Sequence, residues 1–212
     1  MEKTLHYLFD PLCGWCYGAS AALAAVADST AVHLNLLPSG LFAGEGARKM
    51  DDDFAAYAWS NDQRIERLTG QRFTERYRAE VLGNRQQRFD SAPATLALSA
   101  VALTAPGKEL DALKALQQAR YLDGRDITQT DTLVSILETL GLAREALRLQ
   151  TTDAELLDTN RARMNQAQRL LHASGARGVP TFILETESQR TLLHAGTAFS
   201  DPQAFAQELQ TA

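Results

Sequence analysis

The sequence predicts an α/β fold in which a helical insertion separates the two halves of a small sheet. Short apolar runs bounded by turn residues lie near both ends of the 212-residue chain. Between about residues 51 and 149 these strand-like runs are absent, and helix-like segments follow one another instead. The order strand–helix–strand, helical block, helix–strand–strand–helix places helices against one sheet.

The first 40 residues predict strand, helix, strand. Residues 5–9 are a short apolar run that stops at Asp10-Pro11, as expected of a buried strand. Small helix-forming residues extend from about Cys13 to Ala27 and predict one helix. Apolar and polar residues then alternate over residues 32–36, which is the periodicity of a strand. The connection between these two strands is therefore expected to be a parallel crossover.

The last third predicts helix, strand, strand, helix. Residues 154–173 form a helix whose apolar stripe contains Leu157, with Gly175 as its stop. Residues 181–184 and 191–194 are two short strands joined by a polar turn, and we expect them to pair antiparallel. A final helix is predicted from the N-cap Asp201 and Pro202 to near Leu209.

Glycine and proline breaks divide the middle block into several predicted helices. The breaks lie at Thr69-Gly70, Gly83-Asn84, Pro106-Gly107, Asp123-Gly124 and Gly141. We therefore predict one domain from residues 1–45 and 151–212, into which an all-helical domain of residues 46–150 is inserted.

Composition limits the classes of function. The formal charge is −5, which argues against binding to nucleic acid or to an anionic membrane surface. No apolar run approaches the roughly 20 residues that cross a bilayer. The N-terminus lacks the pattern of a secretory signal, so we expect a cytoplasmic protein. The sequence specifies neither a metal site nor an oligomeric state.

Both cysteines lie in Cys13-Gly14-Trp15-Cys16, where the first strand gives way to a helix. The start of a helix stabilises an anion, so Cys13 is predicted to be a nucleophilic thiolate. Cys16, one turn on, is predicted to resolve a mixed disulfide formed at Cys13. Three alternatives stay open: half of a zinc site, a structural disulfide and two unrelated thiols. The first lacks further ligands, and a short disulfide loop restricts the unfolded chain little.

A second motif, Val179-Pro180, opens the strand at residue 181. Proline is tolerated at a strand start because its missing N–H breaks no hydrogen bond there. The alternative is an ordinary trans proline before an edge strand.

Together the two motifs resemble the thioredoxin superfamily, in particular its DsbA-like branch and the cytoplasmic FrnE-like members. The resemblance implies a thioredoxin-like fold, a cis bond before Pro180, and a Val179 backbone that binds substrate like an added strand. We expect substrate contacts at Gly14, Trp15, Val179 and Pro180. Many relatives carry a buried acid six residues before the first cysteine, where this chain has Tyr7. Gly14-Trp15 supplies no charge, so we predict a weaker oxidant than DsbA.

The predicted function is a thiol-disulfide oxidoreductase or isomerase that acts on protein or peptide thiols and disulfides. It needs no bound cofactor, and glutathione is a candidate electron donor. Two alternatives differ in class. One is a glutathione-dependent enzyme like the 2-hydroxychromene-2-carboxylate isomerases or kappa-class transferases, which typically have serine in place of Cys13. The other is a peptide-binding module that does not need Cys13.

Overall fold

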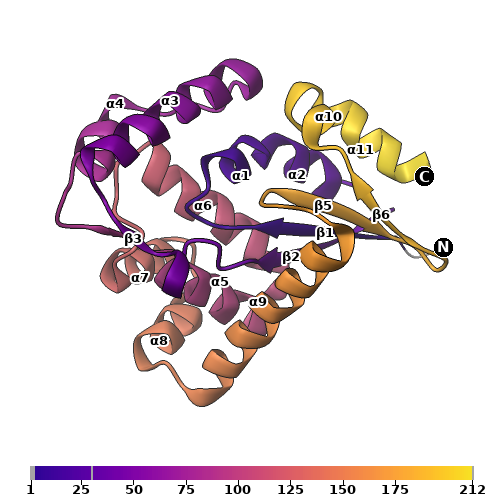
Figure 1. Cartoon of the computed structure of the whole chain (residues 1–212). Helices are drawn as coiled ribbons and strands as arrows, with labels where there is room; N and C mark the ends of the chain where they lie inside the picture. Colours follow the sequence, from indigo (N-terminus) through magenta and orange to yellow (C-terminus); the bar gives the residue numbers. More distant parts are fainter. Residues whose placement is uncertain (1–2, 30, 212) are drawn as a thin grey trace.

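A four-stranded mixed sheet lies at the centre of the computed structural model, which describes residues 3–29 and 31–211 (Figure 1). The strands are β1 (Thr4–Phe9), β2 (His33–Pro38), β5 (Thr181–Glu185) and β6 (Arg190–Leu193). Their order is β2-β1-β5-β6; β1 is parallel to β2 and antiparallel to β5, and β6 is antiparallel to β5. The predicted parallel crossover and antiparallel hairpin are confirmed.

Helices surround this sheet and fill the insertion. They are α1 (Gly14–Gly18), α2 (Ser20–Ala27), α3 (Asp52–Thr69), α4 (Glu75–Tyr77), α5 (Ala92–Thr104), α6 (Glu109–Tyr121), α7 (Thr130–Thr139), α8 (Ala143–Thr151), α9 (Ala154–Ser174), α10 (Ala195–Ser200) and α11 (Pro202–Thr211). A π-helical turn, Arg78–Leu82, continues α4. Short 3-10 turns occupy Gly44–Gly46 and Pro106–Lys108.

Each face of the sheet packs against its own helices because alternate strand residues point to opposite sides. Tyr7 belongs to the large core cluster that also contains Leu23 of α2 and Phe205 of α11. Leu8, the next residue of β1, packs instead in a smaller cluster with Leu170 of α9. Figure 1 shows α2 and α11 on one side of the sheet and α9 on the other. The result is the layered α/β arrangement that the sequence predicts.

The insertion contains the predicted helices. Gly70 and Gly141, two of the predicted breaks, follow α3 and α7 in the left-handed conformation, with φ of 73° and 76°. The expectation that residues 46–150 are all-helical is wrong in one detail. A two-stranded antiparallel ladder pairs β3 (Arg48–Lys49) with β4 (Arg88–Phe89). Each of these strands has only two residues, which is too short for an alternating apolar pattern to be visible in the sequence.

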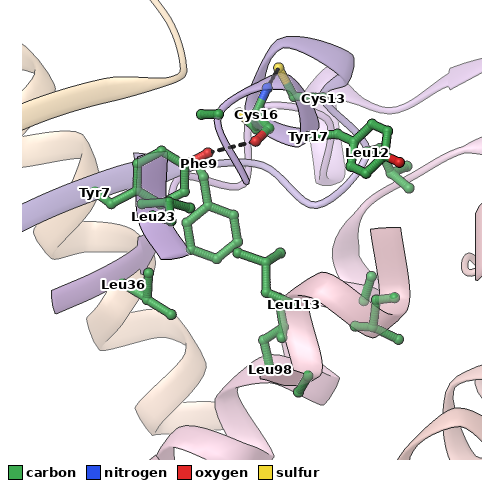
Figure 2. Packing of buried hydrophobic residues seen from close by; sticks show 14 of the residues in the cluster. Tyr7, Phe9, Leu12, Cys13, Cys16, Tyr17, Leu23, Leu36, Leu98 and Leu113 are labelled. Carbon is green, nitrogen blue, oxygen red and sulfur yellow. Dashed lines mark hydrogen bonds between the residues drawn. The ribbon is translucent and has the colours of Figure 1, made fainter. Parts of the chain in front are cut away.

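The insertion and the sheet share one hydrophobic cluster. Leu98 of α5 and Leu113 of α6 belong to the same buried cluster as Tyr7 and Phe9 of β1 (Figure 2). The division of the chain into a domain of residues 1–45 and 151–212 and an inserted domain stays a prediction.

The single helix predicted from Cys13 to Ala27 is divided at Ala19 into α1 and α2. The Cys16 carbonyl accepts hydrogen bonds from the Ala19 N–H at 3.3 Å and from the Tyr7 hydroxyl at 3.0 Å. A side chain that enters the hydrogen-bond ladder in this way bends a helix. The donor comes from β1, so the pattern within residues 13–27 does not reveal the break.

Two further details differ near the C-terminus. Helix α9 has the predicted extent, and Leu170 of the predicted stripe is buried, but Leu157 is 44% exposed and Leu156 takes its place on the buried face. Helix α10 is a short element that the sequence analysis did not predict. The N-cap at Asp201 is confirmed, because its carboxylate accepts from the Ala204 N–H at 3.0 Å.

Candidate active site

Cys13 is the N-cap of α1, as predicted. Its sulfur accepts a hydrogen bond from the Cys16 N–H at 3.4 Å, and its carbonyl accepts from the Tyr17 N–H at 3.0 Å. The Cys13 N–H in turn donates to the Asp10 carbonyl at 3.0 Å, which fixes the turn that follows β1. The sulfur therefore lies at the positive end of α1, where a thiolate is stabilised.

The two thiols have different environments. The Cys13 residue is 7% exposed, whereas Cys16 is fully buried. Burial raises the pKa of the Cys16 thiol well above its usual value, and hydrogen bonding and charge interaction with Cys13 raise it further. Figure 2 shows the Cys16 backbone nitrogen directed at the Cys13 sulfur. Cys16 is thus held as a neutral thiol beside the more exposed sulfur of Cys13.

The backbone of Val179, which precedes β5, lies beside the Cys13 sulfur. The Val179–Pro180 peptide bond is cis, as the resemblance implied. The Cys13 thiol donates to the Val179 carbonyl across a distance of 3.7 Å, so residues 166 positions apart meet at the reactive sulfur. Val179 and Pro180 are both half-buried. This arrangement places the Val179 backbone beside the Cys13 sulfur, and substrate binding there stays a prediction.

Trp15 is half-buried between two neighbours from other elements. Its ring lies 5.3 Å from the Phe199 ring of α10, and the Arg64 guanidinium of α3 lies 5.7 Å from its centroid. The side chain is therefore part of a rim that joins α1, α3 and α10. Whether substrates contact Trp15 or Gly14 stays a prediction.

Tyr7 occupies the position where many relatives carry a buried acid. Its hydroxyl donates to the Cys16 carbonyl at 3.0 Å (Figure 2). Burial raises its pKa well above the ordinary tyrosine value, and the neighbouring cysteines raise it further. Tyr7 therefore stays protonated and supports the helix break instead of accepting the Cys16 proton.

Asp10 is a buried residue to which sequence reasoning gave no role. Its two carboxylate oxygens accept from the Leu12 N–H at 2.9 Å, the Phe42 N–H at 3.0 Å and the Ser91 hydroxyl at 2.7 Å. Burial nevertheless raises the pKa of Asp10. The carboxylate ties the cysteine loop to the loop after β2 and to the start of α5. An acid directly after a buried strand was the one available signal.

Asp62 of α3 is a second buried acid that the sequence did not single out. It is 4% exposed and accepts from the Tyr77 hydroxyl at 3.0 Å. The guanidinium of Arg120, itself 1% exposed, lies 5.5 Å from the Tyr77 ring centroid. The insertion thus supplies a buried acid, a phenol and a cation to the region beneath α1. These three residues lie in three different helices, so no local sequence pattern shows that they meet.

Within residues 3–29 and 31–211, no group of three or more histidine, cysteine, aspartate or glutamate side chains is placed to hold a metal ion. No helix within the same residues has the length and apolar character to cross a membrane.

Comparison with known proteins identifies similar folds over nearly the whole chain. Residues 4–210 match the model of the DSBA-like thioredoxin domain. The structure of the cytosolic disulfide reductase DsbM from Pseudomonas aeruginosa is similar, with a TM-score of 0.88 and 34% identity over 98% of this chain and 97% of that one. The same protein with GSH gives 0.86 and 33% over 98% of both chains. No curated protein sequence matches.

Proposed function

Since the chain belongs to the family of DSBA-like thioredoxin domains, we propose that it is a thiol-disulfide oxidoreductase whose redox pair is Cys13 and Cys16. The observation that carries the proposal is the difference between the two thiols. Cys13 lies at the start of α1 and retains some exposure, whereas Cys16 is fully buried and its pKa is raised. This is the difference that a nucleophile and a resolving thiol require.

The proposed reaction proceeds in two exchanges. The Cys13 thiolate attacks one sulfur of a substrate disulfide, forms a mixed disulfide and releases the other substrate sulfur as a thiolate. Cys16 then loses its proton and attacks the Cys13 sulfur, which releases the second substrate thiol and leaves a Cys13–Cys16 disulfide. The substrate gains two electrons, and the protein loses two.

Reduction is the proposed direction, with glutathione as the electron donor. Two glutathione molecules return the Cys13–Cys16 disulfide to the dithiol and leave as one glutathione disulfide. The similarity to a reductase that has been studied with GSH supports this donor and a cytosolic place of action. The Val179 carbonyl beside the Cys13 sulfur supports extended peptides or glutathione as substrates.

The test is glutathione-dependent reduction of insulin and of bis(2-hydroxyethyl) disulfide, with glutathione reductase and NADPH to follow turnover. Wild-type protein is expected to accelerate both reactions, and Cys13→Ala to abolish the acceleration. Cys16→Ala is expected to retain a glutathionyl group on Cys13, detected by intact mass. Full activity in Cys13→Ala would overturn the proposal and favour a function that does not need the thiol.

A further inference from the structure

The carboxyl group of Asp62 reaches from the insertion to the first residue of α1. A Cβ atom placed on Gly14 would lie 2.4 Å from one Asp62 carboxylate oxygen. The other oxygen accepts from the Tyr77 hydroxyl, which holds the side chain in place. Gly14 directly follows Cys13, so a buried carboxyl group lies against the same helix terminus that stabilises the Cys13 thiolate.

The charged and titratable neighbours of Asp62 come from two other helices and include Tyr121 of α6, whose own pKa the Asp62 charge raises. Tyr77 of α4 donates a hydrogen bond to it, and the positive charge of Arg120 of α6 attracts it. Both lower its pKa, but burial has the larger effect and raises the pKa of Asp62 to about 7. The carboxyl group therefore changes charge in the pH range in which thiol exchange takes place.

We propose that Asp62 is a positioning residue that favours the oxidised form of the Cys13–Cys16 pair, because its carboxylate and the Cys13 thiolate compete for one helix terminus. This inference depends on the proposed redox function. In the proposed reaction the reduced form attacks as a thiolate at Cys13, whereas the disulfide has no charge on its sulfurs. A fixed negative charge nearby thus raises the free energy of the reduced form only. Ionised Asp62 makes the protein a stronger reductant.

The proposal predicts a pH dependence that a packing role would not produce. Above pH 7 the carboxyl group of Asp62 is mostly charged, and its repulsion of the thiolate is at its full strength. Below pH 7 the group is mostly neutral, and the wild-type site resembles one with asparagine at this position. The effect of removing the charge should therefore grow with pH.

The experiment compares the reduction potentials of wild type and Asp62→Asn against glutathione at pH 6 and pH 8. At pH 8 the variant is expected to show a roughly tenfold larger equilibrium constant for the reduced form, a potential about 30 mV less negative. At pH 6 the two potentials should coincide. Asp53→Asn removes an exposed charge from the first turn of the same helix and should leave the potential unchanged.

Tyr77→Phe provides a second variant in case Asp62→Asn does not fold. It removes the hydrogen bond that favours the ionised carboxylate, so it raises the pKa of Asp62 further. Its potential should be less negative than that of wild type at pH 7 and return to the wild-type value at pH 9.

Two results overturn the inference while leaving the proposed function intact. They are an unchanged potential for Asp62→Asn at pH 8 and a shift of equal size at pH 6 and pH 8. A wild-type protein that forms no Cys13–Cys16 disulfide would instead overturn both proposals.

Discussion

Replacing Asp10 by alanine is expected to destabilise the fold strongly, because this buried carboxylate joins three segments around the cysteine loop. It accepts hydrogen bonds from the Leu12 and Phe42 N–H groups and from the Ser91 hydroxyl. Alanine leaves the two backbone donors without this partner. The Ser91 hydroxyl is able to rotate toward another acceptor, so its loss contributes less.

The magnitude follows from the two backbone donors. A buried donor left without a partner costs about 1–3 kcal/mol. The removal of a buried carboxyl group offsets part of this, since burial outweighs the hydrogen bonds and raises the pKa of Asp10. We therefore expect a net loss of about 3 kcal/mol for Asp10→Ala. Asp10→Asn keeps one carbonyl acceptor, and we expect it to lose roughly half as much.

The assay is equilibrium unfolding in urea, followed by far-UV circular dichroism with both cysteines reduced. Asp28→Ala is the control, because Asp28 is an exposed acid and surface changes usually stay within about 0.5 kcal/mol. A loss below about 1 kcal/mol for Asp10→Ala would refute the reasoning, since the three contacts would then contribute little.

Three further predictions concern residues around the cysteines. Gly14→Ala places a methyl group 2.4 Å from an Asp62 oxygen, so urea unfolding should show a loss of about 1–3 kcal/mol rather than the gain usual for alanine in a helix. The wild-type free energy of unfolding should fall as pH rises from about 4 to about 7, because the folded state holds the Asp62 proton more tightly; the full shift corresponds to about 4 kcal/mol. Asp62→Asn should lose this part of the slope, and an unchanged slope would contradict the assignment. Tyr7→Phe should cost about 1 kcal/mol in stability but preserve disulfide exchange, whereas abolished exchange would mean that the hydroxyl takes part in the chemistry.

Local sequence signals were sufficient for the four strands of the central sheet, for several helix ends and for the position of the cysteine pair at the start of α1. Apolar runs at residues 5–9 and 181–184 mark two strands of the sheet because burial on both faces leaves few polar residues. The N-cap position of Cys13 follows from the change of pattern after Pro11. These features depend on neighbours along the chain, so periodicity reveals them.

Features that depend on distant partners were not predictable. The Tyr7 hydroxyl that bonds the Cys16 carbonyl near the break at Ala19 comes from β1, and the role of Asp10 needs donors from the segments around Phe42 and Ser91. Asp62 lies on a helix rich in charged residues, where a buried acid and a solvated one have the same appearance in the sequence. Tertiary packing alone distinguishes them.

The measurement that tests the central claim most directly is a redox titration of wild-type protein against glutathione, followed by tryptophan fluorescence, with Cys13→Ala as the control. We predict one two-electron couple with a potential more negative than the roughly −120 mV of DsbA, because Gly14-Trp15 provides no charge that stabilises the thiolate. Cys13→Ala should show no transition. The absence of a Cys13–Cys16 disulfide in wild type would contradict the account and redirect attention to glutathione adducts on Cys13.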